Sequence, residues 1–367
     1  MAINGIETVL YGVNDVAECT RYFVDFGLPL FEQSEAHAHF RLDEGSNVII
    51  RHIHDPLIPK SALVGTGVCE TIWGVDRQSD LDRLVSNLRQ SREVRVDPDG
   101  TAHCLTDDGL AVGFRLYRKL PVHSAPDPLN SPGNINRLNQ QRKWKVKARP
   151  KQILHVVFQV PDFDKSWAFY RDQLGFRLSD IQKTFGIFGR APEANDHHNI
   201  YFLNAHLPFP GLDGQVRFDH VNYGVEDLDE VMIGTNHMQR QGWPKSVWGL
   251  GRHRIASSIF MYLPCPTGGQ AEYGADSDYL DDSWVPRVWN PMFGFFTFVH
   301  NLAPYMMDAA PWEWDYAPGY TPEAKAKATP PPSADSPHEE SSPPKGKPTA
   351  EAKPAAPAES TMAIDKA

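Results

Sequence analysis

One pattern recurs four times along the chain and constrains its fold most strongly: an apolar run, a polar residue and then an amphipathic stretch. The runs begin at Ile6, Glu70, Leu154 and His220. The alternation within each run predicts a strand, and the periodicity after it predicts a helix. Gly27 and Gly175 end two of these stretches, as a glycine commonly ends a helix. Short strand candidates follow each helix, so the sequence predicts four βαβββ units, two per half, offset by about 150 residues.

A single unit of this kind cannot bury both faces of its sheet, which predicts that the units pair. We expect an α+β fold of two domains, residues 1–119 and 151–282, each a half-open barrel of two units with the helices outside. Residues 120–150, rich in Pro, Asn and basic side chains, join them. We expect a solvated linker there, although such a basic run can also contact phosphate or a partner.

Two further segments follow the second predicted domain. Residues 283–320 are unusually aromatic, and we expect them to form core or subunit-interface packing, or a lid over the site. Residues 321–367 contain no Phe, Trp, Tyr, Leu or Val and are rich in Pro, Ala, Lys and Glu. Such a segment cannot bury enough apolar area to offset its ordering entropy, so we expect it to be disordered.

Charge, cysteine usage and hydropathy exclude several classes of protein. The formal net charge of −10 argues against nucleic-acid binding. The four cysteines form no CxxC pair, which favours reduced thiols in the cytoplasm. The sequence has no apolar run long enough to span a membrane, and its start lacks the basic and apolar pattern of a signal peptide, so we expect neither. No phosphate-binding glycine motif is evident, so we expect no nucleotide cofactor.

In the second half, strand alternation directs three polar side chains toward one cavity: His155, His220 and Glu272. Two imidazoles and one carboxylate can bind a divalent metal and leave one face of it open. This ligand set is typical of non-haem Fe(II) sites, would also suit Mn(II), and occurs in catalytic zinc sites.

The first half serves as an internal control for this assignment. By alignment of the repeats, the positions of His155, His220 and Glu272 correspond there to Thr8, Glu70 and Val112. Thr and Val are poor metal ligands, so we expect the first domain to hold no metal.

The sequence resembles the type I extradiol catechol dioxygenases of the vicinal oxygen chelate superfamily. The likeness covers residues 3–280 and is most specific from His155 to Gly274. It depends on an ordered set of motif residues: His197-His198 before an apolar run, Gly251-Arg252-His253, then Tyr262, then Glu272.

The resemblance implies a role for each motif residue. His155, His220 and Glu272 would bind Fe(II), His198 would be the catalytic acid and base, and His253 and Tyr262 would bind and polarise the substrate oxygens. His197 would be a solvated or hydrogen-bonded neighbour of His198. The implied reaction inserts both atoms of O2 into a small catechol-type aromatic diol, as in the catabolism of aromatic compounds. Relatives are commonly multimers, so we expect a homo-oligomer.

Two departures from the family leave the substrate open. The loop through Pro208 and Gly211 is longer than in most relatives, and the aromatic segment 283–320 is unusual. Arg252 or Arg254 would suit a ring that carries a carboxylate.

Two other functions remain open. The first is a lyase or isomerase of the same superfamily, which uses its metal as a Lewis acid and often takes ligands from both halves. Thr8 and Val112 argue against it, and Glu70 favours it. The second is a non-catalytic protein that binds a small aromatic ligand.

Overall fold

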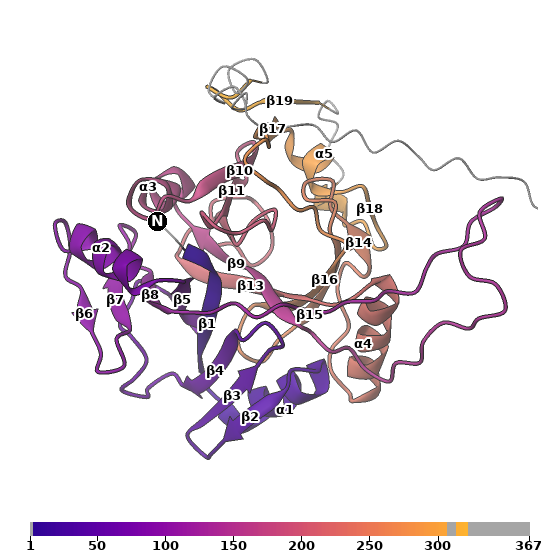
Figure 1. Ribbon diagram of the computed structural model, residues 1–367, viewed down its shortest axis with the longest axis horizontal. Coiled ribbons are helices and arrows are strands. Elements are labelled where there is room, and N and C mark those ends of the chain that lie inside the picture. Colours follow the sequence, from indigo (N-terminus) through magenta and orange to yellow (C-terminus); the bar gives the residue numbers. More distant parts are fainter. Residues whose placement is uncertain (1–2, 307–312, 322–367) are drawn as a thin grey trace, which may run out of the picture. The chain divides into compact units, whose positions relative to one another are not determined.

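The computed structural model describes residues 3–306 and 313–321, and within them the four predicted βαβββ units follow one another in order (Figure 1). The first unit is β1 (Ile3–Val13), α1 (Val16–Phe26), β2 (Leu30–Gln33), β3 (His37–Arg41) and β4 (Asn47–His52). The second is β5 (Gly67–Val75), α2 (Gln78–Leu88), β6 (Arg95–Val96), β7 (Ala102–Leu105) and β8 (Ala111–Leu116). The expected disorder of residues 322–367 lies outside the described residues.

The second half repeats this order. The third unit is β9 (Gln152–Val160), α3 (Phe163–Leu174), β10 (Arg177–Gln182), β11 (Gly186–Arg190) and β12 (Ile200–Asn204). The fourth is β13 (Arg217–Gly224), α4 (Leu228–Arg240), β14 (Gly251–Arg252), β15 (Ile259–Pro264) and β16 (Gln270–Ala275). The α+β class predicted from the sequence is therefore confirmed.

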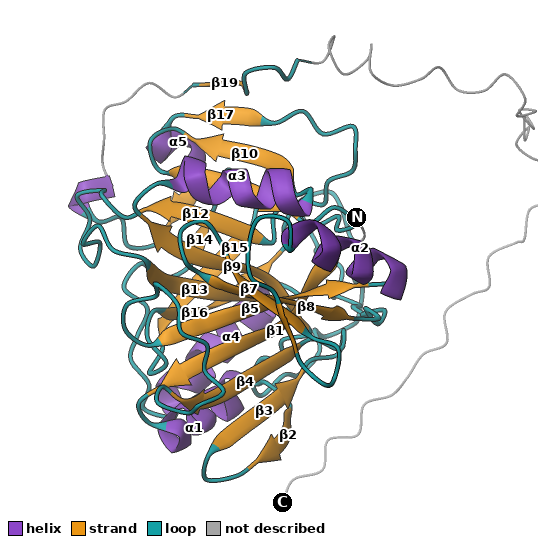
Figure 2. Ribbon diagram, turned by 90° about the vertical axis from the view of Figure 1, so that its left-hand side faces the viewer, coloured by secondary structure: helices purple, strands orange, loops and turns teal. Residues whose placement is uncertain are grey.

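The units pair as predicted, because each half forms one sheet. The first sheet has the order β2-β3-β4-β1-β5-β8-β7-β6, and the second contains β14-β15-β16-β13-β9-β12-β11-β10. In both sheets the first strands of the two units lie antiparallel at the centre, β1 beside β5 and β9 beside β13. The four helices lie around the outside of the strands in Figures 1 and 2.

Local sequence sets the ends of the helices. Asp15, Asp162 and Asp227 precede α1, α3 and α4, and each carboxylate accepts a hydrogen bond from a backbone N–H in the first turn. Gly27 and Gly175 end α1 and α3 at φ values of 105° and 73°, which side chains with a Cβ rarely adopt. The capped ends fix where each helix crosses its sheet.

Alternation along β9 separates core from cavity as predicted. Val156, Phe158 and Val160 belong to the main hydrophobic core. The intervening His155, Val157 and Gln159 face a cavity. Polar residues can therefore gather on one face of the strand while the other face stabilises the fold.

The aromatic segment adds strands to both edges of the second sheet. β17 (Arg287–Trp289) pairs with β10, β18 (Phe298–Val299) pairs with β14, and α5 (Pro291–Phe295) lies between them. We call residues 287–299 the strap. The short helix η1 (Pro304–Met306) follows, and β19 (Trp314–Tyr316) pairs with β17. Trp312, part of the aromatic set in the sequence, lies outside the described residues.

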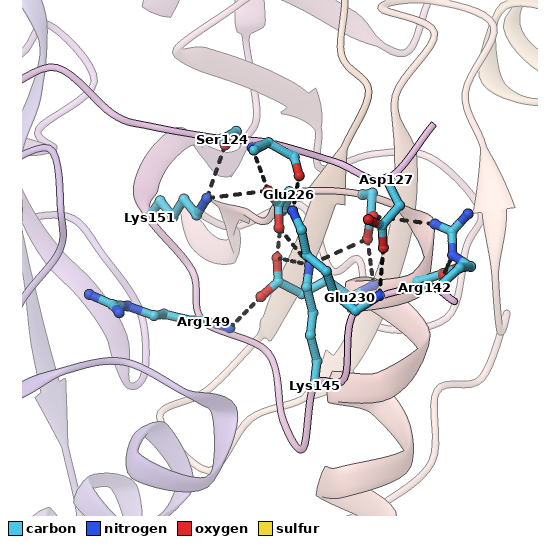
Figure 3. Close-up of polar contacts among 12 residues, drawn as sticks. Ser124, Asp127, Arg142, Lys145, Arg149, Lys151, Glu226 and Glu230 are labelled. Carbon is cyan, nitrogen blue, oxygen red and sulfur yellow. Dashed lines mark hydrogen bonds and ion pairs between the residues drawn. The ribbon is translucent and has the colours of Figure 1, made fainter. Parts of the chain in front are cut away.

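The linker 120–150 departs from the expected solvated segment. Most of its residues are exposed, but two of its basic side chains, Arg142 and Lys145, bind the N-terminal end of α4 (Figure 3). Lys145 Nζ lies 2.7 Å from a Glu226 oxygen and 3.4 Å from a Glu230 oxygen. Arg149 donates its backbone N–H to Glu230 at 3.0 Å. The acidic first turn of α4 attracts these cations, so the linker is held against the second half.

Two expectations from composition can be compared with the described residues. All four cysteines are free, and three of them are buried. Among the helices of the described residues, none has the length and apolar character needed to cross a membrane.

Candidate metal centre

His155, His220 and Glu272 converge as the sequence predicts. The Nε2 atoms of the two histidines lie 3.3 Å apart. Glu272 Oε2 lies 3.3 Å from His155 Nε2 and 3.2 Å from His220 Nε2. All three residues are buried, and they form the one cluster with metal-ligand geometry among the described residues.

Strand register explains the convergence. His155 on β9 pairs with Asn222 on β13, and Asn222 pairs with Glu272 on β16. Tyr262 on β15 continues this row by pairing with Glu272. His220 lies two residues before Asn222 and shares its face of the sheet, because side chains alternate along a strand. Four adjacent strands therefore direct their side chains to one point.

The donor atoms suit a divalent cation. Glu272 Oε2 is buried without a hydrogen-bond partner, although it lies beside both imidazoles. Burial raises the pKa of Glu272, but the two histidines outweigh burial and hold the pKa well below its usual range. Burial lowers the pKa of His220, but the hydrogen bond to Asp219 and the negative charge of the neighbouring Glu272 raise it to about 9. The site therefore favours a positive charge, and the three side chains can coordinate one cation together.

Asp219 is a candidate functional residue that the sequence analysis missed. Its Oδ1 accepts a hydrogen bond from His220 Nδ1 at 2.6 Å, and its Oδ2 accepts one from Gln159 Nε2 at 2.7 Å. A proton on Nδ1 leaves the lone pair of His220 on Nε2, which faces Glu272. A metal-binding histidine usually has such a partner, so an Asp beside a candidate ligand was the available signal.

His198 lies directly against His155, one of the three candidate ligands. Its ring stacks on His155 with centroids 4.1 Å apart. The next residue, Asn199, fixes this turn by donating to the carbonyl of Leu154 at 3.0 Å and accepting from the N–H of Ala191 at 2.9 Å. Burial, with the neighbouring His155, lowers the pKa of His198 well below its usual range, so the ring is neutral.

His197 is not solvated. It is 2% exposed, and its ring contacts His198 on one side and Asp180 on the other. Of the two expectations for this residue, the hydrogen-bonded neighbour is confirmed. The surface position is wrong because Phe188 and Trp284 pack around the ring.

His253 and Tyr262 form a hydrogen-bonded pair. His253 Nδ1 donates to the carbonyl of Phe295 at 2.8 Å, so its Nε2 accepts from the Tyr262 hydroxyl at 3.1 Å. Burial lowers the pKa of His253 to about 4, and the ring stacks between Phe260 and Phe295. Burial and the charge of Glu272 raise the pKa of Tyr262 well above its usual value. Both groups are therefore neutral hydrogen-bonding groups.

One cavity of about 540 Å³ joins these residues. It is lined by His155, His198, His220, His253 and Tyr262, and also by Val64–Thr66, Phe209–Leu212, Trp248, Phe295 and Tyr305. The long loop, the strap and a segment of the first half thus all contribute to its wall. Arg252 and Arg254 are absent from this wall. Arg252 pairs with Asp276, which removes the expected basis for a carboxylate-bearing substrate.

The position that corresponds to Glu272 in the first half is Gly113, and the expected Val112 is wrong by one residue. Thr8 pairs with Ile72, and Ile72 pairs with Gly113, as His155 pairs with Asn222 and Asn222 with Glu272. Val112 points into the hydrophobic core instead. A register shift of one residue exchanges the two faces of a strand, which spacing alone did not resolve.

Comparison with known proteins agrees with this geometry. The profile of the Glyoxalase/Bleomycin resistance protein/Dioxygenase superfamily matches residues 152–244. Metapyrocatechase 2 of Cupriavidus necator is 32% identical over 200 residues, which cover 54% of this chain and 57% of that protein. An iron-dependent extradiol dioxygenase of Rhodococcus jostii (strain RHA1) is 31% identical over 149 residues, 36% of this chain and 46% of that protein. The matches thus span about half the length of these curated relatives.

Solved structures extend the likeness to the whole fold. BphC, a halotolerant catechol dioxygenase, superposes with a TM-score of 0.63 at 18% identity and covers 83% of this chain and 97% of that one. The Mn(II)-bound glyoxalase from Novosphingobium aromaticivorans gives a TM-score of 0.62 at 21% identity, covering 84% of this chain and 95% of that one. At these identities the likeness is one of fold.

Proposed function

We propose that this protein is an extradiol ring-cleaving dioxygenase that inserts both atoms of O2 into a catechol-type aromatic diol. The observation that carries the proposal is a cluster of two imidazoles and one carboxylate, whose imidazoles line one cavity together with three further hydrogen-bonding side chains. The names of the curated relatives, metapyrocatechase and extradiol dioxygenase, support it.

His155, His220 and Glu272 would hold Fe(II) as the resident metal. When bound, the cation supplies open coordination positions and lowers the pKa of a diol that binds to it. The name of the Rhodococcus relative favours iron, and the same three donors also suit Mn(II). Metal analysis of the purified protein separates the two.

The remaining side chains would bind the diol and move its protons. Tyr262 donates to His253 in the present geometry, and its hydroxyl can turn to a substrate oxygen in the same cavity. His198 is neutral and borders the cavity, so it can take a proton from a diol hydroxyl and return it to an oxygen that leaves. The aromatic wall of the strap and the long loop excludes water from this transfer.

The substrate would be a small aromatic diol of aromatic catabolism with an apolar substituent or none. Aromatic side chains such as Phe188, Phe209 and Trp248 line the cavity. The cation on its wall, Arg217, is already paired with Asp213 at 2.7 Å. A charged substituent on the ring would therefore lack an ion-pair partner in the cavity wall.

The division of labour between domains belongs to the same proposal. Residues 151–282 would be the catalytic domain, and residues 1–119 a related domain without metal. We also infer a homo-oligomer, because the linker exposes several large apolar side chains, among them Trp144 at 92%. A cytoplasmic location is supported by the four free cysteines.

The test is oxygen uptake by protein loaded anaerobically with Fe(II), across a panel of catechols. One O2 consumed for each diol, with the yellow colour of a ring-cleaved product, is the expected result. Metal binding without oxygen uptake would instead indicate a lyase or isomerase, and diol binding without metal would indicate a binding protein. Sedimentation analysis of the same sample measures the oligomeric state.

A further inference from the structure

Two buried polar residues lie behind His198 and away from the cavity. Asp180 on β10 is 1% exposed and His197 is 2% exposed, and neither lines the cavity wall. Burial of two such side chains is costly unless they are hydrogen-bonded to each other and to their neighbours. Their hydrogen bonds form a continuous chain that ends at His198.

The direction of this chain follows from its first member. Asp180 Oδ1 accepts the backbone N–H of Arg287 at 2.7 Å, where β17 pairs with β10. Asp180 Oδ2 remains to accept from His197 Nε2–H at 3.2 Å. With its proton on Nε2, the His197 ring can accept a hydrogen bond through the lone pair on Nδ1.

That lone pair determines the state of His198. The Nδ1 atoms of His197 and His198 lie 3.1 Å apart, so His198 donates its Nδ1–H to His197. The lone pair of His198 is thereby left on Nε2. Stacking on His155 and edge contact with Phe188 hold the ring in this orientation.

We propose that Asp180 and His197 are positioning residues that hold His198 in the tautomer whose Nε2 can accept a proton from the substrate. The inference rests on the proposed function, in which His198 is the acid and base. When a diol hydroxyl gives its proton to Nε2, His198 becomes an imidazolium that still donates Nδ1–H to His197. The carboxylate of Asp180 stabilises that charge through His197, and the proton later returns from Nε2 to a leaving oxygen.

Asp180→Asn tests the direction of these hydrogen bonds without changing the shape of the side chain. The Arg287 N–H requires an acceptor, so the amide oxygen stays at the Oδ1 position and the NH2 group faces His197. The NH2 donates to His197 Nε2, the proton of His197 moves to Nδ1, and His198 then carries its proton on Nε2. We expect kcat to fall by roughly 100-fold or more, with KM and metal content near the wild-type values.

Glu70→Gln is the matched control. Glu70 is a buried carboxylate at 3% exposure that accepts from His103 at 2.8 Å in the first half, away from the catalytic cavity. If the loss of kcat is specific to the hydrogen bonds behind His198, the isosteric Glu70→Gln change should keep kcat within about 3-fold of wild type. Equal losses in both variants would indicate a general effect on folding and would overturn the proposal.

His197→Gln and His197→Phe separate hydrogen bonding from packing. A glutamine offers one N–H for Asp180 and one oxygen for His198 Nδ1–H, so it retains the tautomer and much of kcat. Phenylalanine fills the space without either bond, so we expect a loss similar to that of Asp180→Asn. Equal activity in the two variants would contradict the proposal.

A measurement without turnover keeps this inference distinct from the proposed function. In protein labelled with 15N-histidine and loaded with diamagnetic Zn(II), the ring nitrogen shifts of His198 report which atom carries the proton. The signal is assigned by its loss in His198→Phe. We expect a proton on Nδ1 in wild type and on Nε2 in Asp180→Asn. The same tautomer in both proteins would overturn the proposal whether or not a diol is cleaved.

Discussion

The two halves of the chain have the same strand order and use equivalent positions differently. In the second half the row across four strands is His155, Asn222, Glu272 and Tyr262, and in the first half it is Thr8, Ile72, Gly113 and His103. Glu70 takes the place of His220 and accepts a hydrogen bond from His103, whereas His220 faces His155 and Glu272. The core faces of both sheets remain apolar. The fold therefore depends on one face of each sheet, and the chemistry depends on the other.

The edges of the sheets differ as well. In the second half the strap connects the edge strands β10 and β14 and lines the cavity with Phe295. In the first half the edge strand β2 is exposed along its length, and the cavity of about 860 Å³ is lined by paired charges such as Arg95 and Asp97. A largely apolar cavity wall strengthens electrostatic interactions beside it, and the charged wall in the first half lacks this condition.

Removal of one ligand should have the largest effect. His220→Ala is expected to abolish metal binding and ring cleavage, because two donors cannot hold the cation at a site with one face open. Glu70→Ala, at the equivalent position, should leave the metal content at the wild-type value. Metal analysis of the two purified variants measures the contrast. Loss of metal in Glu70→Ala would show that the first half also binds the cation.

His198→Phe should keep the metal and lower kcat by about 10²–10⁴-fold, the usual contribution of general acid–base catalysis. The equivalent residue of the first half is Ser46, because Asn199 and Asn47 occupy the same place and each donates to a carbonyl on the first strand of its unit, β9 or β1. Ser46→Ala should therefore turn over normally. Steady-state oxygen uptake compares the variants, and near-normal kcat in His198→Phe would remove the acid–base role.

Asp219→Asn should have a smaller effect on the same site. The amide no longer stabilises the proton on His220 Nδ1 with a full charge, and loss of such a partner commonly weakens metal binding by about 10–100-fold. Competition with a chelator measures the affinity. An unchanged affinity would mean that the 2.6 Å contact orients the ring without tuning the ligand.

Much of the difference between the two halves is predictable from the sequence. The features that are not predictable depend on contacts between residues far apart in sequence. Periodicity locates the four units, and alternation locates His155, His220 and Glu272, because both depend on short-range patterns. The position of Gly113 depends on register between strands far apart in sequence, and the strap forms by pairing with strands β10 and β14, far from it in sequence. Asp180 lies 17 residues before His197, and only the fold brings the two into contact. Local patterns carry no signal for such partners.

A smaller effect is expected from the contact between Glu226, just before α4, and the linker, because this contact depends on pH. Burial raises the pKa of Glu226, but hydrogen bonds from Lys145 and Ala125 outweigh burial and lower it to about 2. Because this pKa is below the usual 4.5, the contact stabilises the fold fully above pH 4.5 and loses its effect as the pH falls toward 2.

Glu226→Gln should therefore cost about 1 kcal/mol of the free energy of unfolding at neutral pH and progressively less toward pH 2. Urea unfolding at several pH values measures this difference, with the exposed Glu35→Gln as the control. A cost that stays constant down to pH 2 would indicate that packing, and not the charge of Glu226, holds the linker.

The smallest effect concerns the helix ends. Asp227 caps α4, whereas Arg77 stands at the N-cap of α2 with no hydrogen bond from its side chain to the helix. The Arg77 backbone is already extended, at φ −133° and ψ 140°, so a serine there can accept a first-turn N–H without rearrangement. Arg77→Ser should raise the free energy of unfolding by about 0.5–1 kcal/mol, and Asp227→Ala should lower it by a similar amount. Calorimetry of both variants measures these changes in stability. If Arg77→Ser gains no stability while Asp227→Ala loses it, the ion pairs of Asp227 with the linker cations stabilise α4 more than its capping hydrogen bond does.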